Sequence, residues 1–309
     1  MKVIITARSF AQADAEPLNM LQNEGFDLER VTDMRELPQR IGEADGIIAG
    51  LEAYGKELFS IAPRLKIISR YGVGCDAIDL AAAKDAGVVV TVTPGANSDS
   101  VADLAVTLLL SAARQVPRMD ASIRAGKQER PLGVEMWRKV IGVIGTGRIG
   151  KGVIERLRGF QMQVLMFDIY QDNAFAREHN ARYVPLDVLY RESDFITIHS
   201  PLTEETRSMI GKNEFAKMKK TAVIVNTARG GIIDEAALAA ALAAGSIGAA
   251  ALDATITEPP YGSPLCALPN CILTPHAGAA TYEASLNMGR MSARNVIDYF
   301  RTGTCANAV

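Results

Sequence analysis

The stretch from Gly145 to Gly150 has residue types and spacing suited to binding a dinucleotide phosphate. It follows the apolar run Val140–Ile144 and opens an amphipathic segment, Ile149–Leu157, which we expect to be a helix. Gly145 permits a tight turn, Gly147 leaves room for a pyrophosphate against the backbone, and Gly150 lets the helix approach the strand. The amino terminus of such a helix supplies N–H groups and partial positive charge.

An acidic residue stands where this type of site requires one. Asp168 ends the next expected strand, Gln163–Phe167, 18 residues after Gly150. A carboxylate there accepts hydrogen bonds from ribose hydroxyls and repels a 2′-phosphate. The following residues, Ile169-Tyr170-Gln171, offer no arginine to reverse that preference. The motif therefore predicts NAD rather than NADP as the cofactor.

Three more residues follow expected strands in the second half of the chain. Arg229 follows Ala222–Asn226, Glu258 follows Ala249–Asp253, and His276 follows Ile272–Thr274. Ligands of open parallel sheets gather beyond the carboxyl ends of the strands, so we expect these side chains to converge. A histidine exchanges protons near neutral pH, a neighbouring carboxylate favours and orients the protonated imidazole, and an arginine binds a substrate carboxylate. The set predicts oxidation of an alcohol carbon, or the reverse reduction.

The elements that must position these residues alternate along the chain. In residues 1–97, short β-branched runs alternate with amphipathic helix candidates, and a second series begins at Val140. The pattern predicts an α/β fold with two lobes, each a parallel sheet covered by helices on both faces. Residues 115–133 are expected to be a polar connection, and Tyr282–Arg301 a helix with no strand after it.

Composition excludes several classes of protein. The chain of 309 residues carries 33 Lys and Arg against 35 Asp and Glu, so no global field recruits nucleic acid or an anionic membrane. The helix candidate Val101–Ala113 is too short to cross a bilayer, and no export signal is evident. The four cysteines lack partners at zinc spacing. We expect a cytoplasmic protein with free thiols, without a metal and without nucleic-acid or membrane partners.

Together these motifs identify a family resemblance. The matching stretches are Gly145–Gly150, His199–Thr203, Asn226–Glu235, Leu252–Pro259, Thr274–Glu283, Arg70–Asp76, Pro94–Ser98 and Val101–Asp103. They cover nearly the whole chain and resemble the D-isomer-specific 2-hydroxyacid dehydrogenase family. Within it, the chain is most similar to the phosphoglycerate dehydrogenase branch, in a short form without the C-terminal regulatory extension.

The resemblance implies roles for individual residues. It implies that Arg229, Glu258 and His276 are catalytic, with Arg229 and His276 also touching the substrate. It implies substrate contacts at Arg70, Gly72, Val73 and Gly74. For the cofactor it implies contacts at Gly145, Thr146, Gly147, Arg148, Ile149, Gly150, Asp168, His199, Pro201, Thr227, Asp253 and Gly278.

The resemblance also implies an organisation. Residues 1–97 and 282–309 would form a discontinuous substrate domain, and 98–281 a Rossmann NAD-binding domain. The two lobes, Rossmann-like and flavodoxin-like, would enclose an active-site cleft, and two copies would dimerise through the NAD-binding domains. The substrate would be a small D-2-hydroxy acid or its 2-keto partner.

One departure bears on the substrate. Phosphoglycerate-specific members carry arginine near the end of the third strand, where this chain has Leu51-Glu52-Ala53. A carboxylate there would oppose a substrate phosphate, so a glyoxylate or hydroxypyruvate reductase remains an alternative. An NAD(H)-sensing protein, similar to corepressors that resemble this family, and a formate or phosphite oxidoreductase are the others.

Overall fold

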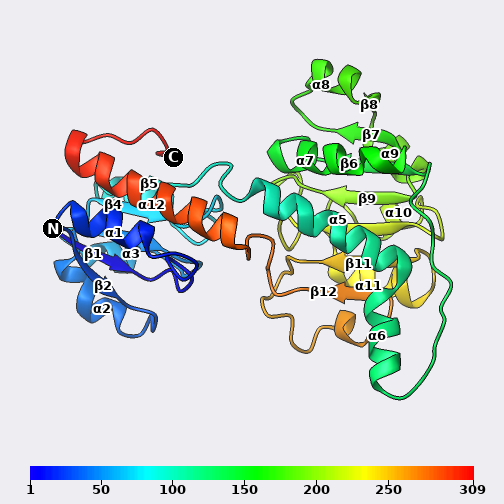
Figure 1. Cartoon of the computed structure of the whole chain (residues 1–309), viewed down its shortest axis with the longest axis horizontal. Coiled ribbons are helices and arrows are strands. Elements are labelled where there is room, and N and C mark those ends of the chain that lie inside the picture. The colour runs from blue at the N-terminus through cyan, green and yellow to red at the C-terminus, as the bar shows by residue number, and fades with distance from the viewer. The chain divides into compact units, whose positions relative to one another are not determined.

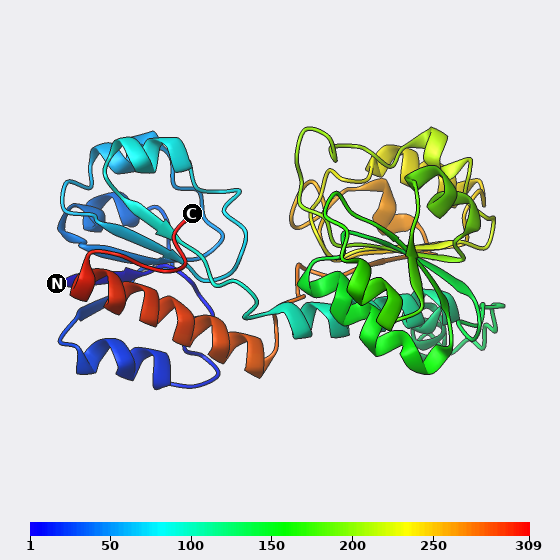
Figure 2. The same ribbon diagram turned by 90° about the horizontal axis from the view of Figure 1, so that it is seen from above.

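The computed structural model describes all 309 residues and divides them into two compact units. Unit 1 comprises residues 1–97 and 279–309, and unit 2 comprises residues 98–278. Each unit contains one sheet whose strands all pair in parallel, with helices on both faces (Figure 1, Figure 2). The expected α/β class with two parallel sheets is confirmed. No helix in the structure combines the length and apolar character needed to cross a bilayer.

Unit 1 contains a five-stranded sheet in the order β2-β1-β3-β4-β5. The strands are β1 Lys2–Ile5, β2 Asp27–Arg30, β3 Gly46–Ala49, β4 Ile67–Arg70 and β5 Val89–Thr91. The helices are α1 Glu16–Asn23, α2 Leu37–Arg40, α3 Lys56–Ser60, α4 Leu80–Asp85 and α12 Tyr282–Thr302, with a 3₁₀ turn at Ile41–Glu43.

Alternating side chains of the strands fill two cores in unit 1. Val3 and Ile5 pack with residues of α1 and α12, whereas Ile4 faces the other side and packs with residues of α2, α3 and α4. This period of two is the geometry of a strand. The helix expected at Tyr282–Arg301 therefore completes the sheet that the first 97 residues build, because it covers one of its faces.

No strand follows the last helix, as expected, but the chain end still pairs with the sheet of unit 1 through an isolated bridge. Ala308 forms an antiparallel bridge with Thr91, and the amide of Val309 donates to the carbonyl of Val90 at 3.0 Å. The segment is too short to give a strand pattern in the sequence.

Unit 2 contains a seven-stranded sheet in the order β12-β11-β10-β9-β6-β7-β8. The strands are β6 Val140–Ile144, β7 Gln163–Phe167, β8 Ala181–Tyr183, β9 Phe195–Ile198, β10 Val223–Asn226, β11 Ala249–Leu252 and β12 Cys271–Leu273. The helices are α5 Ser98–Arg114, α6 Val116–Arg124, α7 Arg148–Leu157, α8 Asn173–Glu178, α9 Leu186–Glu192, α10 Lys212–Phe215 and α11 Glu235–Ala243, with 3₁₀ turns at Arg158–Phe160 and Pro264–Ala267.

The strand order of unit 2 reverses direction at β6. The chain runs from β6 outward through β7 to β8, then returns to β9 on the other side of β6 and continues outward to β12. Such a switch point leaves a crevice beyond the carboxyl ends of the two central strands, which is where parallel α/β sheets bind ligands. Gly145 and His199 are the first residues after these two strands.

Asn295 links three segments of unit 1, and we expect its loss to destabilise that unit. The residue is 2% exposed, and its side chain donates to the carbonyl of Val92 at 2.9 Å and accepts from the side-chain amide of Asn307 at 2.8 Å. Asn295→Ala leaves these buried groups without partners, which should cost about 1–3 kcal/mol of unfolding free energy. Hydrogen exchange of β5 and α12 amides measures the loss.

The control for this substitution is Arg294→Ala, which changes an exposed neighbour on the same helix. It should alter the unfolding free energy by less than about 0.5 kcal/mol. Equal protection in the two variants would show that the Asn295 hydrogen bonds do not stabilise unit 1.

Candidate active site

The glycine turn after β6 is shaped by close backbone approaches. Gly145 has φ +89°, and a Cβ on it would lie 2.6 Å from the carbonyl carbon of His199. A Cβ on Gly150 would clash with the carbonyl oxygen of Gly145, so only glycine lets α7 start this close to β6. Gly147 is the N-cap of α7, and a Cβ there would meet open space. Open backbone at a helix amino terminus fits a pyrophosphate.

Asp168 lies beside this turn, at the end of β7. Its Oδ2 accepts from the amide of Thr146 at 2.6 Å and from the Thr146 hydroxyl at 3.2 Å, and its Oδ1 accepts from the amide of Tyr170 at 2.9 Å. The Thr146 hydroxyl also contacts the Tyr183 hydroxyl at 2.9 Å. A carboxylate oxygen has room for two hydrogen bonds, so Oδ1 retains acceptor capacity for a ribose hydroxyl. Arg148 and Ile149 occupy the first turn of α7.

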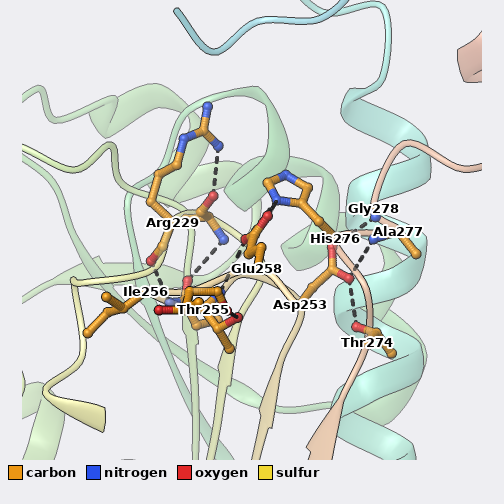
Figure 3. A network of polar contacts seen from close by, with 12 residues as sticks. Arg229, Asp253, Thr255, Ile256, Glu258, Thr274, His276, Ala277 and Gly278 are labelled. Carbon is orange, nitrogen blue, oxygen red and sulfur yellow. Dashed lines mark hydrogen bonds and ion pairs between the residues drawn. The ribbon is translucent and has the colours of Figure 1, made fainter. Parts of the chain in front are cut away.

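His276 and Glu258 form a hydrogen-bonded pair beyond β11 and β12. The Nδ1 atom of His276 lies 2.9 Å from Oε2 and 3.0 Å from Oε1 of Glu258, and the two side chains are 32% and 36% exposed. Figure 3 shows the carboxylate and the ring facing each other. Because Glu258 occupies Nδ1, Nε2 is the ring nitrogen left to meet a ligand.

This pairing shifts both pKa values toward the charged forms. The hydrogen bond to Glu258 raises the pKa of His276 above its ordinary 6.5, although burial acts in the opposite direction. For Glu258, burial alone would raise the pKa, but the hydrogen bond and the charge of His276 lower it overall. The positive charge of Arg229 contributes a lowering to both groups.

Arg229 is carried on a turn that Asn226 stabilises. The Asn226 side chain accepts from the amide of Ala228 at 2.9 Å and donates to the carbonyl of Arg229 at 2.8 Å. A Cβ on the next residue, Gly230, would clash with the backbone of Thr255, so the turn lies directly against the loop that carries Glu258. The structure thus brings Arg229, Glu258 and His276 together at one edge of the sheet, all within unit 2 (Figure 3).

Asp253 fixes the backbone of the histidine turn. Its buried carboxylate accepts from the Thr274 hydroxyl at 2.6 Å and from the amides of Ala277 and Gly278 at 2.7 and 2.8 Å. The amide of His276 donates to the Asp253 carbonyl at 3.0 Å, and His276 has φ +52°. A non-glycine residue in this left-handed region is strained unless its surroundings hold it, and here Asp253 supplies those contacts.

Glu235 is a positioning residue that the sequence motifs did not single out. Its Oε1 accepts from the amide of Ile256 at 2.6 Å, and Thr255 donates its amide to Glu258 at 3.3 Å. These two bonds hold the loop between β11 and Glu258. Glu235 is the first residue of α11, where an acidic residue has an ordinary role in favouring the helix terminus, so its sequence position gave no separate signal.

His199 is not part of the His276–Glu258 pair. Burial lowers its pKa to about 3, and its ring contacts the hydroxyls of Thr197 at 2.9 Å and Thr227 at 3.4 Å. It is therefore a neutral imidazole near neutral pH. Pro201 follows in the same segment, and its carbonyl accepts from Thr206 at 2.8 Å.

The remaining residues of interest belong to unit 1. Arg70, at the end of β4, donates to the carbonyls of Gly74, at 3.0 Å, and Tyr71. Its guanidinium lies over Gly72, which has φ +143°, and Val73 is 46% exposed. Arg70 thus shapes the loop of Gly72, Val73 and Gly74.

The pairing of His276 with Glu258 and the burial of His199 predict how these two histidines titrate. His276 should protonate above its ordinary pKa of 6.5, and His199 should stay neutral to about pH 3. Glu258→Gln removes the carboxylate that stabilises the imidazolium, so the pKa of His276 should fall. NMR titration measures this shift, with His179→Gln to assign the third signal. An unchanged His276 pKa in Glu258→Gln would contradict the pairing.

Comparison with known proteins identifies the family. Residues 106–278 match the model of the D-isomer specific 2-hydroxyacid dehydrogenase, NAD binding domain. The chain is 40% identical over 300 residues to D-3-phosphoglycerate dehydrogenase of Archaeoglobus fulgidus, covering 95% of this chain but only 57% of that protein. It is 40% identical over 271 residues to glyoxylate reductase of Korarchaeum cryptofilum, covering 85% of this chain and 82% of that one.

Solved structures agree with this result. The apo-structure of D-lactate dehydrogenase from Escherichia coli superimposes with a TM-score of 0.88 at 29% identity, covering 100% of both chains. The resemblance found in the sequence is thereby confirmed. The chain belongs to the D-isomer-specific 2-hydroxyacid dehydrogenases, a family of NAD-dependent oxidoreductases.

Proposed function

We propose that this protein interconverts a small D-2-hydroxy acid and its 2-oxo acid, with His276 as the acid/base. The observation that carries the proposal is the His276–Glu258 pair beside Arg229, at the carboxyl edge of an NAD-binding sheet. When bound, NAD supplies the hydride acceptor or donor.

His276 holds the proton that the reaction needs. With Nδ1 paired to Glu258, Nε2 donates its proton to the oxygen of a 2-oxo acid, or takes the hydroxyl proton in the opposite direction. The raised pKa increases the fraction of the imidazole that carries the proton, which favours reduction. Arg229 binds the substrate carboxylate and the 2-oxygen with its planar guanidinium, and thereby orients and polarises the carbonyl.

Substrate binding in unit 1 is assigned to the loop after β4. We infer that the Gly72, Val73 and Gly74 backbone meets the substrate carboxylate and that Arg70 holds this loop in place. The contacts of Arg70 with the carbonyls of Tyr71 and Gly74 support that assignment.

The cofactor residues follow from the same geometry. The open turn at Gly145–Gly150 and the carboxylate of Asp168 support binding of pyrophosphate and ribose. The proposed cofactor contacts lie in three sets. They are the turn Gly145–Gly150, which includes Thr146, Arg148 and Ile149; Asp168, which would bind the ribose; and His199, Pro201, Thr227, Asp253 and Gly278.

A homodimer and a cytoplasmic location complete the proposal. Exposed apolar side chains on α6 and the segment after it support association of two copies through unit 2: they are Val116, Ile123, Leu132 and Trp137, exposed by 46% to 95%. The near balance of acidic and basic residues suits a protein that acts on small molecules in the cytoplasm.

Replacing His276 tests the acid/base assignment. His276→Gln should lower turnover by roughly 10²- to 10⁴-fold while the dissociation constant of NADH stays almost unchanged, because proton transfer is lost and the cofactor site is not. NADH absorbance with glyoxylate, hydroxypyruvate or pyruvate reports turnover. His179→Gln, which changes a histidine stacked on Phe175, is the matched control and should keep its rate.

An unchanged rate in His276→Gln would reject the assignment. NADH binding by the wild-type protein with none of these 2-oxo acids reduced would favour a dinucleotide-sensing protein instead.

Replacing Asp168 tests the cofactor preference. Asp168→Ala should weaken NADH binding by roughly tenfold to a hundredfold, since charge-assisted hydrogen bonds to the ribose are lost, and it should narrow the preference for NADH over NADPH. Titration of NADH and NADPH binding measures both effects. Glu155→Gln, which removes the same charge from an exposed position of α7, should leave both constants as in the wild type. A variant that remains equally selective would show that Asp168 does not reach the ribose.

A further inference from the structure

Glu52 stands at the carboxyl edge of the unit 1 sheet, just beyond β3. Its neighbours there are Thr6, the first residue after β1, and Tyr54, whose side chain is fully buried. The Oε2 atom of Glu52 lies 3.3 Å from the Thr6 hydroxyl and 3.5 Å from the Tyr54 hydroxyl, and these two hydroxyls are 2.6 Å apart. The Thr6 and Tyr54 hydroxyls therefore hold the carboxylate in place through Oε2.

The hydrogen-bond donors around Glu52 are too few to satisfy both of its carboxylate oxygens. Thr6 and Tyr54 have one proton each, and one of these hydroxyls donates to the other, so a single proton remains for Oε2 or for the carbonyl of Ile48. Oε1 accepts no hydrogen bond in the structure, and Glu52 forms no ion pair, although the charge of Arg70 acts on the neighbouring Tyr54. A half-buried carboxylate in this state favours a ligand that donates a hydrogen bond and disfavours an anion.

Gly50 provides the space that this carboxylate occupies. A Cβ on Gly50 would lie 2.5 Å from Oε2 and 2.7 Å from Oε1 of Glu52, so the carboxylate is folded over the backbone of the glycine. Gly50 does not have a positive φ. Its role at this position is therefore to leave room rather than to allow an unusual backbone conformation.

The register of the sheet relates Glu52 to the proposed substrate loop. Ala49 of β3 pairs with Arg70 of β4, so the segments that follow these two strands leave the sheet side by side. Adjacent strands are about 4.8 Å apart, which is close to the length of a three-carbon acid. A substrate with its carboxylate on the Gly72–Gly74 loop would thus extend its third carbon toward Glu52.

We propose that Glu52 determines specificity by accepting a hydrogen bond from a neutral hydroxyl on the substrate's third carbon and by excluding a phosphate or carboxylate there. This inference rests on the proposed function. In this role, Glu52 would favour 3-hydroxy-2-oxo acids, of which hydroxypyruvate is the simplest, over their phosphorylated forms.

A basic hollow at the other end of the same edge does not provide a phosphate site for such a substrate. It is lined by residues after β1 and by the end of β2 and the residues after it, including Arg8, Arg30 and Arg35. Arg30 donates to the carbonyls of Ala7, Arg8 and Phe10, and Arg35 is paired with Asp33. β3 lies between β1, which Arg8 follows, and β4, so the hollow is about two strand spacings, or about 10 Å, from the segment after β4. This is more than the distance between the carboxylate and the phosphate of a phosphorylated three-carbon acid.

The test compares three substrates in the full-length protein with NADH. Glyoxylate has no third carbon and reports the proposed function, while hydroxypyruvate and phosphohydroxypyruvate differ only in the phosphate. The wild type should show a higher kcat/KM for hydroxypyruvate than for phosphohydroxypyruvate. Glu52→Gln should lower the ratio of hydroxypyruvate to phosphohydroxypyruvate kcat/KM by about tenfold or more, because a charge repulsion at close range is removed.

Two further variants sharpen this test. Gly50→Ala displaces the carboxylate without removing its charge, so it should also lower the ratio. Glu43→Gln removes the same charge near Lys2 at the start of β1, which is the opposite edge of the sheet, and should leave the ratio within about twofold.

The outcomes distinguish a failure of the Glu52 assignment from a failure of the proposed function. A wild type that reduces glyoxylate but prefers phosphohydroxypyruvate would reject the role of Glu52 alone, as would a ratio in Glu52→Gln equal to that in Glu43→Gln. No reduction of any of the three substrates would reject the proposed function and this inference with it.

Discussion

The parallel register of β10, β11 and β12 is the constraint on which the candidate site depends. Asn226, Leu252 and Leu273 lie in line across these strands, so the three segments that follow leave the sheet at the same edge. Arg229, Glu258 and His276 are distant in sequence, yet each needs only a few residues beyond its strand to reach the others. A shift of the register by one residue would turn each strand's core side chains to the opposite face, and the two apolar cores of unit 2 fix it against such a shift.

Short loops are then made rigid by polar groups rather than by apolar packing. Asp253 holds the turn of His276, Asn226 holds the turn of Arg229, and Glu235 holds the loop that leads to Glu258. Each of these side chains accepts from or donates to backbone groups that would otherwise lack partners. The hydrogen bonds of Asp253 offset the conformational free energy that a left-handed backbone conformation costs His276. The ring is thereby oriented before any ligand binds.

Much of this arrangement was predictable from the sequence because its signals are local. The glycine turn, the acidic residue after the next strand and the apolar strand runs are all short patterns with a direct mechanical meaning. The convergence of Arg229, Glu258 and His276 required only the rule that parallel strands end at one edge.

Other features of the fold gave no such signal in the sequence. Residues 115–133 were expected to be a connection, yet Val116–Arg124 forms α6, with Pro117 in its first turn, where proline is compatible with a helix. The edge strand β8 has three residues, and the carboxylate of Glu52 folds over Gly50 because of a space that only the packed structure reveals.

In the proposed function, chemistry and selectivity depend on different sheets. The proton-exchanging pair, the guanidinium beside it and the dinucleotide turn all follow strands of unit 2, where each is fixed by several hydrogen bonds. Glu52, in contrast, is held through one of its oxygens by hydroxyls of unit 1. A substitution at Glu52 therefore changes the charge that a substrate meets without disturbing the groups that move protons. Because Coulomb interactions at a half-buried position are strong compared with the thermal energy, the proposal needs only one side chain at this edge to favour a neutral substrate over its phosphorylated form. This division agrees with the names of two relatives, a D-3-phosphoglycerate dehydrogenase and a glyoxylate reductase, which are equally identical to this chain but are named for different acids.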